Sequence, residues 1–218
     1  MANFFSPEGK LYQFMTRLYD ILKLNFLWIL CSLPIITVGV STIAAFTITL
    51  RMVENTEGNI AIPFFKAFKQ NLKQGIPMTF ITILGAWAVY LNFEVFRVAE
   101  SAFFLITAII SGYIVTFSLI YAFPLLARYE NTVVKTLVNS FRISMRYFFR
   151  SVFVAFIFAL GVVLMSWSAT TMLVGLLIGP ASIFLAMSGP AMSVFRKIEA
   201  ENSGNTENIE STKDAKPD

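Results

Sequence analysis

Two glutamates are the best-placed candidates for acid–base chemistry in this sequence. Glu54 and Glu130 each open a Glu-Asn-Thr triplet after an uncharged run, and each lies within three residues of an arginine, Arg51 or Arg128. A guanidinium next to a carboxylate favours its ionised form and pairs with it. We therefore expect both triplets to be helix-capping turns with structural ion pairs, and Arg128, Glu130 and Asn131 to be a structural motif.

Other residue types that carry catalysis are scarce. The sequence contains no histidine, the commonest general base and metal ligand. Its one cysteine, Cys31, cannot form an intramolecular disulfide or a thiolate metal cluster, and its apolar surroundings predict a small packed residue. No phosphate-binding glycine loop or nucleophile motif is present. We therefore expect no enzymatic activity, no cofactor and no metal site.

Uncharged polar side chains inside the apolar runs are the remaining candidates for a binding site. They could line a pocket for a neutral polar ligand, with aromatic rings stacking on a sugar face. Helix–helix packing and interfacial belts are the expected roles for such residues. The hydroxyls are Ser32, Thr37, Ser41, Thr42, Thr47, Thr79, Thr82, Ser111, Thr116, Ser118, Ser166, Ser168 and Thr170, and the aromatics are Trp28, Trp87, Tyr90, Tyr113 and Tyr121.

Long uncharged runs must position all these side chains. Residues 24–50, 74–93, 101–127 and 151–195 carry no charge over 27, 20, 27 and 45 residues. A helix of roughly 20 apolar residues crosses a bilayer. The chain is 56% hydrophobic and only 14% charged, whereas soluble domains contain about 25% charged residues. The sequence therefore predicts a polytopic membrane protein.

The expected fold is an all-α membrane bundle of about five transmembrane helices with cytoplasmic amphipathic helices at the interface. The last run is too long for one crossing and should turn at the polar residues 166–171. Pro34 and Gly39 should break the first span, and this leaves an alternative with a re-entrant first segment and four full spans. The favoured spans are 22–50, 76–93, 102–126, 150–165 and 172–195.

The distribution of lysine and arginine predicts the orientation. Four lie in residues 51–73 and five in residues 128–150, whereas the loop at 94–100 has only Arg97 and the turn at 166–171 has none. The positive-inside rule places both long loops and the C-terminus in the cytoplasm. Five spans then put the N-terminus outside, against the preference of Lys10, Arg17 and Lys23, and the re-entrant alternative would resolve that conflict.

Three domain segments follow from this organisation. Residues 1–23 form an N-terminal amphipathic interfacial segment, and residues 24–197 form the membrane domain. Residues 198–218 are polar and acidic, and we expect them to be disordered.

Both basic loops read as amphipathic helices. In 133–150, Lys135, Asn139, Arg142, Arg146 and Arg150 recur at helical spacing beside an apolar stripe. Attachment to a membrane surface with anionic lipids is the expected role, and docking of a partner is the alternative. The candidate partner-binding residues are Lys66, Lys69, Lys73, Arg142 and Arg146.

The two loops also resemble each other. When the chain is shifted by 76 residues without gaps, nine of the 37 positions in 50–86 are identical, including both Glu-Asn-Thr triplets. We infer a tandem repeat, with residues 24–93 and 101–165 as parallel units and the last span added.

Several motifs together resemble the YesL-like family of multi-pass membrane proteins of Gram-positive bacteria. The most distinctive is Pro-Ile-x-Thr-x-Gly-x-Ser, which contains Pro34, Thr37, Gly39 and Ser41. The resemblance covers most of residues 1–197. The other motifs are Phe4-Phe5-Ser6-Pro7-Glu8-Gly9-Lys10, Leu24-Asn25-x-Leu27-Trp28, Phe64-Phe65-Lys66-x-Phe68-Lys69-x-Asn71 and Phe123-Pro124-Leu125-Leu126-Ala127-Arg128-Tyr129-Glu130-Asn131.

The resemblance implies a bacterial cell-membrane protein without an assigned activity, and it supplies no catalytic residues. Members are often encoded near carbohydrate ABC-transporter genes. This context implies an accessory to carbohydrate uptake or its sensing, in contact with an ABC-type permease and the lipid bilayer. The alternative is a small solute-binding or transport protein with a neutral ligand in its bundle. Nucleic acid is not an expected partner, and the sequence does not predict whether the chain forms homo-oligomers.

Overall fold

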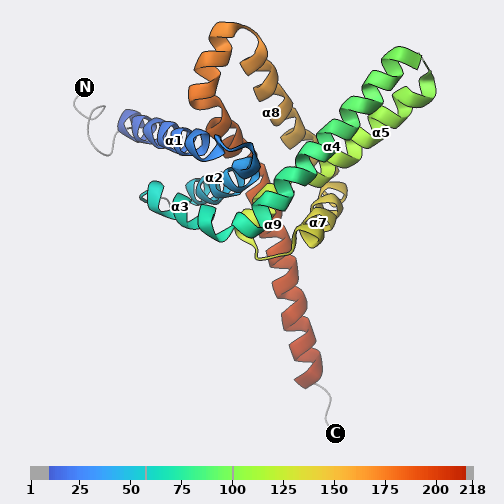
Figure 1. The fold of residues 1–218 in the computed structure, drawn as a ribbon. Helices are drawn as coiled ribbons and strands as arrows, with labels where there is room; N and C mark the ends of the chain where they lie inside the picture. Colours follow the sequence, from blue (N-terminus) through green and yellow to red (C-terminus); the bar gives the residue numbers. More distant parts are fainter. Residues whose placement is uncertain (1–9, 57, 100, 215–218) are drawn as a thin grey trace.

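The computed structural model describes residues 10–56, 58–99 and 101–214, which contain helices and no strand. Most helices end at a proline, a polar turn or a Glu-Asn-Thr triplet. In chain order the elements are α1 (Lys10–Ser32), the short 3-10 helix η2 (Ile35–Thr37), α2 (Val38–Val53), α3 (Ala61–Gln70), α4 (Leu72–Ala99), α5 (Ala102–Leu119), α6 (Ala122–Arg128), α7 (Val133–Arg146), α8 (Phe148–Ser166) and α9 (Ala169–Asp214) (Figure 1).

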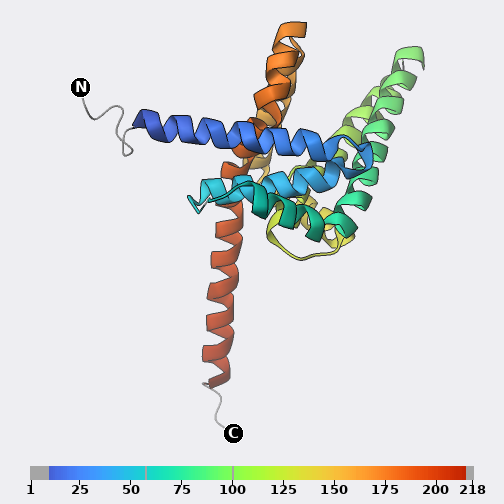
Figure 2. The same ribbon diagram turned by 60° about the vertical axis from the view of Figure 1, so that its left-hand side comes forward.

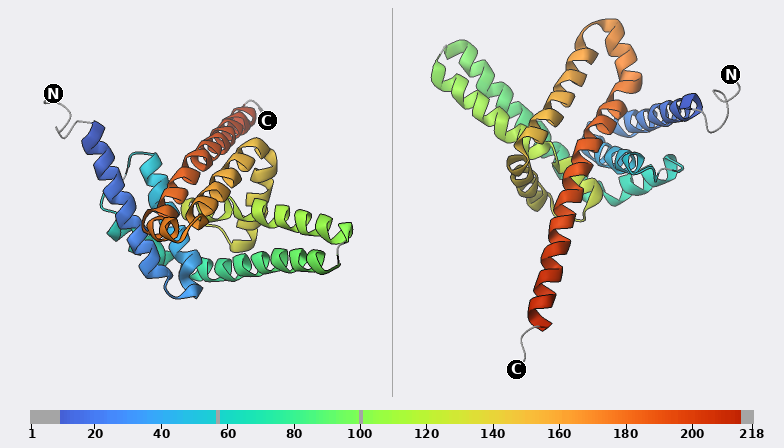
Figure 3. Two further views of the ribbon diagram at one scale, coloured as in Figure 1. Left: turned by 90° about the horizontal axis from the view of Figure 1, so that it is seen from above. Right: turned by 180° about the vertical axis from the view of Figure 1, so that it is seen from behind.

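Two helical hairpins dominate the shape. α4 packs along α5, and α8 packs along the first part of α9, and the two hairpins diverge from a common body (Figures 1 and 3). α1, α2 and α3 run crosswise to α9 (Figure 2). We call the end of the body opposite the hairpin tips, where α3, α6 and α7 lie, the basal end.

Five stretches are long and apolar enough to cross a membrane: Ile35–Val53, Leu72–Ala99, Ala102–Arg128, Phe148–Ser166 and Gly175–Glu201. The prediction of an all-α polytopic membrane fold is thus confirmed. The first stretch differs from the others because 67% of it is buried inside the protein, against 11% for Leu72–Ala99 and for Phe148–Ser166. α2 is therefore surrounded mainly by other helices, while the hairpins present their side chains outward.

The start of the chain departs from the predicted boundaries. α1 is continuous from Lys10 to Ser32, so it joins the predicted interfacial segment to the start of the predicted span at 22–50. The predicted break at Pro34 is present, since η2 and α2 follow it. Residues 1–9 of the predicted segment lie outside the described residues.

Two further helices differ from expectation. The predicted span at 102–126 is divided into α5 and α6, because Pro124 has no N–H to donate to the carbonyl of Ile120. Towards the C-terminus, α9 continues to Asp214, where disorder was expected from residue 198. Ion pairs to Glu199 and Glu201 attach the start of this extension to α6 and α7.

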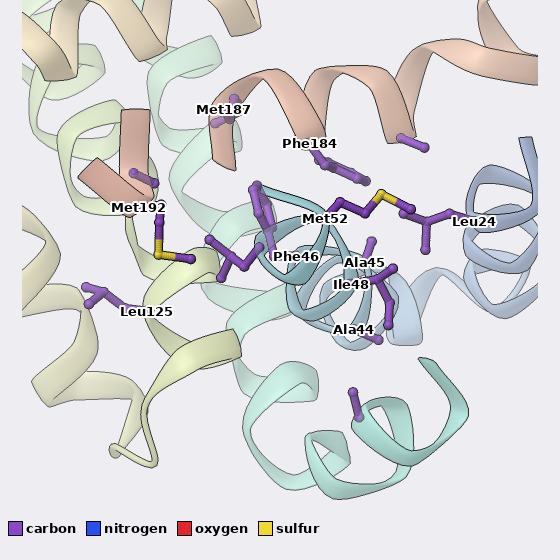
Figure 4. Packing of buried hydrophobic residues seen from close by; sticks show 14 of the residues in the cluster. Leu24, Ala44, Ala45, Phe46, Ile48, Met52, Leu125, Phe184, Met187 and Met192 are labelled. Carbon is purple, nitrogen blue, oxygen red and sulfur yellow. The ribbon is translucent and has the colours of Figure 1, made fainter. Parts of the chain in front are cut away.

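The core lies where α1, α2, α6 and α9 meet (Figure 4). Phe184 of α9 is its central aromatic residue, with ring centroids 5.7 Å from Trp28 and 5.1 Å from Phe46. Both distances are typical of favourable aromatic pairs. Leu24, Met52, Leu125 and Met192 belong to the same buried cluster.

The 76-residue offset also relates helix ends and buried positions. α3 ends at Gln70 and α4 begins at Leu72, and at this offset α7 ends at Arg146 and α8 begins at Phe148. Between residues 60 and 78, four buried residues of the first unit fall on four buried residues of the second. However, α2 packs closely on α4, whereas α5 and α8 diverge (Figure 1). The repeat remains a prediction that the register supports. The buried pairs are Ile60 and Thr136, Phe64 and Ser140, Gly75 and Ser151, and Met78 and Val154.

Candidate functional site

The Pro-Ile-x-Thr-x-Gly-x-Ser motif forms the turn between α1 and α2. Pro34 follows the end of α1, and the Thr37 hydroxyl lies 2.7 Å from the carbonyl oxygens of both Cys31 and Pro34. The Cys31 carbonyl lies in the last turn of α1, where carbonyls lack an intrahelical donor, so Thr37 satisfies a group that the break leaves free. The Pro34 carbonyl also accepts the Thr37 backbone N–H at 2.8 Å. Ser41 donates to the Thr37 carbonyl at 3.0 Å. The predicted motif residues thus stabilise a helix break.

Gly39 lets α2 approach α4 closely. Its N–H donates to Thr79 Oγ1 at 2.9 Å, and Thr79 donates in turn to the Gly75 carbonyl at 2.9 Å. A Cβ at Gly39 would lie 2.5 Å from Thr79 Oγ1 and 2.7 Å from the Gly75 oxygen. A Cβ at Gly75 would likewise lie 2.6 Å from Val40. This small-residue contact is a close helix–helix crossing of the kind favoured in membranes.

Asn25 of α1 fills a gap in the hydrogen bonds of α9. Pro180 has no N–H, so the carbonyl of Leu176 loses its helical donor. Asn25 Nδ2 donates to that carbonyl at 2.7 Å and to the Leu177 carbonyl at 2.8 Å, while Asn25 Oδ1 accepts the Ala181 N–H at 3.1 Å. Asn25 is 1% exposed, and its amide thereby satisfies three backbone groups of another helix.

α7 is attached to the junction of α5 and α6 by hydroxyl groups. Ser144 donates to the carbonyl of Phe117 at 2.8 Å, and Ser140 Oγ accepts the N–H of Tyr121 at 3.2 Å. Both serines are fully buried, and so is Thr136 one turn earlier. The hydroxyl row, which we define as Thr136, Ser140 and Ser144, is therefore the face of α7 that packs on the protein.

An ion-pair cluster joins α2, α6 and α9 at the basal end. Arg128 binds Glu199 with two nitrogens, at 2.9 and 3.1 Å, and reaches Glu54 at 3.2 Å. Arg196 lies 3.9 Å from the same Glu54 oxygen. Glu54 is thus paired, as predicted, but with Arg128 of the other unit instead of its neighbour Arg51. The cluster is partly exposed and its contacts are those of a structural network.

Tyr129 completes this cluster by donating its hydroxyl to Glu199. Burial, with added contributions from the hydrogen bond and the charge of Glu199, raises the pKa of Tyr129 to about 12, so the phenol stays protonated. Glu130 is exposed and Asn131 is half-buried, and among the described residues neither side chain has a hydrogen bond or ion pair. The structural contacts that were expected of Arg128, Glu130 and Asn131 are thus formed by Arg128 and Tyr129.

The five candidate partner-binding residues divide into two groups. Lys66 and Lys69 lie on α3 and Lys73 follows at the start of α4, and all three are exposed. Arg142 and Arg146 are exposed on α7, which stands on the opposite side of α9 from α3 (Figures 1 and 3). Arg146 binds Glu201 at 2.9 Å. The structure therefore does not bring these residues into one patch, and their role in partner binding remains a prediction.

Most of the uncharged polar side chains form hydrogen bonds within their own helices. Thr42, Thr47, Thr79 and Thr82 each donate to the carbonyl four residues earlier. An open groove of about 430 Å³ lies between α4 and α5, but its lining is apolar apart from Tyr90. Among the described residues, no three His, Cys, Asp or Glu side chains are arranged to hold a metal ion.

Two contacts were not anticipated from the sequence. Asn25 interrupts an apolar run, and that interruption was a signal for a buried polar role, but its partners lie 151 or more residues away. Glu199 belongs to the segment expected to be disordered. Its position two residues after the basic pair Arg196 and Lys197 gave no indication that Arg128 would bind it.

Comparison with known protein families finds one match. Residues 21–93 match the family described as a protein of unknown function, DUF624, which is the YesL-like family. The matched region runs from within α1 to within α4, so it contains the motif turn and the close contact of Gly39 with Thr79. Neither the curated proteins nor the solved structures gave a match.

Proposed function

We propose that this chain is a non-enzymatic protein of the bacterial cell membrane that assists carbohydrate uptake or its sensing by contacting an ABC-type permease. The basal end would face the cytoplasm, together with the C-terminus. The sugar context comes from the family resemblance. The mode of action, binding of another protein, rests on the side chains that the structure leaves exposed.

One contrast carries the proposal. Most hydroxyls that could bind a small solute are already used within their own helices, whereas basic side chains at the basal end are exposed. Lys66, Lys69 and Lys73 make no ion pair with the described residues and stand beside the exposed apolar side chains of Ile62 and Phe65. Apolar contacts surrounded by a polar rim are the general composition of protein interfaces.

α3 also supplies the rigidity that a docking surface needs. Phe64 is fully buried and Ala67 is 5% exposed, so α3 is packed against the body on one face and presents the lysines on another. We name the surface formed by Ile62, Phe65, Lys66, Lys69 and Lys73 the α3 surface. Because Arg142 and Arg146 lie across α9, the α3 surface alone is the proposed site of the permease.

The test is crosslinked co-purification from native membranes, followed by mass spectrometry of the partners. The charge reversal K66E/K69E should lower recovery of permease or solute-binding subunits about tenfold, a change typical of losing charges at an interface. The double variant K135E/R142E on α7 is the matched control and should leave recovery unchanged. Equal recovery with the K66E/K69E variant and the unaltered protein would contradict the proposal.

A second candidate is a small solute-binding or transport protein, favoured by the break between α1 and α2 at Pro34. Broken membrane helices supply backbone groups to substrates in transporters. Binding or transport of a sugar by the purified protein in liposomes, with no partner present, would support this candidate over the accessory role.

A further inference from the structure

α7 is built with three rows of side chains, and the buried row is not the apolar one. The hydroxyl row packs on α5 and α6 and is at most 1% exposed. The corresponding positions of α3 include Phe64, which is buried in the ordinary apolar way. The apolar row of α7 is therefore available to contact an environment outside the described chain.

We define the apolar row as Val134, Val138, Met145 and Phe149, all of which are exposed, whereas Leu137 and Phe141 beside it are half-buried. Val134, Val138 and Met145 are 70%, 45% and 47% exposed, and Phe149 at the start of α8 is 87% exposed. Apolar surface in water costs about 25 cal/mol for each Å². A row of this extent is thus expected to be covered by an apolar environment.

Basic side chains border the apolar row. Lys135 and Arg142 are exposed and form no ion pair among the described residues, whereas Arg146 pairs with Glu201. The helix Val133–Arg146 contains no acidic residue. Two copies of this face would repel each other, so its charge is complementary to an anionic occupant and not to a second copy.

We propose that α7 and the first turn of α8 bind the anionic phospholipids of the adjacent membrane leaflet. The apolar row would lie at the level of the acyl chains, and Lys135 and Arg142 would contact headgroup phosphates. A helix with this combination of rows is suited to the membrane interface, where each basic residue strengthens binding to anionic lipid. This inference is independent of the proposed permease contact on the α3 surface.

Quenching by brominated lipids tests the proposal directly. Because Cys31 is the only cysteine, the variant C31S/V134C places one bimane label on the apolar row of the full-length protein. The labelled protein is reconstituted in phosphatidylcholine vesicles that contain brominated phosphatidylglycerol or brominated phosphatidylcholine at equal mole fractions. The ratio of the two quenching efficiencies reports the local enrichment of anionic lipid.

We expect both lipids to quench, with brominated phosphatidylglycerol enriched about tenfold at low salt. Adding K135E/R142E should bring the enrichment to unity, whereas K66E/K69E, with the same change in charge, should leave it unchanged. Equal quenching by both lipids, or an equal effect of the two double variants, would overturn anionic recognition by α7. The absence of quenching by either lipid would show that the row lies away from the acyl chains, and would overturn the proposal as well.

Discussion

The hydrogen bonds of Asn25 explain why a polar side chain is buried at this position. It satisfies the two carbonyls and one N–H of α9 that the proline at 180 disturbs. In a membrane, such groups have no water to bind, so neighbouring helices must satisfy them. Asn25 thus allows the segment of α9 around Pro180 to be buried although its helical hydrogen-bond pattern is interrupted there.

Replacing this amide should lower the stability of the protein, and a second substitution should restore part of it. Asn25→Leu leaves three buried groups unpaired and should destabilise the protein by about 2–5 kcal/mol in thermal or chemical unfolding in detergent. Adding Pro180→Ala restores an N–H for the Leu176 carbonyl, so N25L/P180A should recover part of the loss.

Asn92→Leu is the matched control, because Asn92 is half-buried and its Nδ2 donates to the Ala88 carbonyl of its own helix. It should change stability by less than about 1 kcal/mol. If P180A gave no recovery in the N25L background, the interpretation of Asn25 as the partner of the interrupted helix would be wrong.

Residue types alone revealed part of this picture. The spacing Pro34, Thr37, Gly39 and Ser41 predicted a break with capping groups, because proline and hydroxyl side chains act within a few residues. Asn25 and Glu199 could not be placed in the same way, since their partners are distant in sequence and are brought near only by packing.

At the scale of elements, α9 is held by side chains from three helices. Arg128 binds Glu199, Arg146 binds Glu201, and Arg150 donates to Ser193 at 2.8 Å. These contacts lie between residues 193 and 201, just below the apolar part of α9. They fix the direction in which the C-terminal extension leaves the body (Figure 1).

Loss of the central arginine should loosen this segment. Arg128→Gln removes the two-nitrogen contact with Glu199 and should accelerate amide exchange in residues 193–203 about tenfold, which corresponds to roughly 1–2 kcal/mol of local opening. Arg97→Gln at the tip of α4 removes an exposed pair with Glu94 and should have no measurable effect on that segment. Exchange rates that are equal in the R128Q variant and the unaltered protein would show that the apolar core alone holds α9.

Helix periodicity predicted the existence of α3 and α7 and the basic stripe of α7. It predicted that α7 attaches to a membrane surface, but it did not predict which side chains pack on the protein. Thr136, Ser140 and Ser144 form the buried row, and the partners of the two serines on α5 and before α6 are distant in sequence. The third predicted span is likewise interrupted between Leu119 and Ala122, and the effect of Pro124 on this helix was not anticipated.

At the scale of the whole molecule, the divergent hairpins place both of their turns at one end. Ser101 precedes α5 and Ser168 precedes α9, whereas Lys69 lies at the basal end. If the basal end faces the cytoplasm, single cysteines at the two serines should react with a membrane-impermeant maleimide in intact cells. A cysteine at Lys69 should react only after permeabilisation.

The C31S variant supplies the cysteine-free background for this measurement. Labelling of S101C and S168C from opposite sides would contradict the arrangement of the two hairpins. Labelling of both only after permeabilisation would reverse the proposed orientation while leaving the fold intact. The positive charges of the loops predict this orientation, which stays a prediction until the labelling is measured.

The long-range bonds of α1 and α2 to later helices have a consequence for the order of synthesis. Asn25 cannot form its hydrogen bond until Leu176 has been synthesised. Glu54 cannot pair until Arg128 of α6 is present, and Arg128 in turn pairs with Glu199, which is synthesised later still. The polar groups of Asn25 and Glu54 therefore leave the ribosome unpaired. Asn25 is satisfied only by α9, and Glu54 by Arg128 of α6. A nascent chain that stops before residue 176 is expected to remain open and to depend on chaperones or the insertion machinery until the final segment arrives.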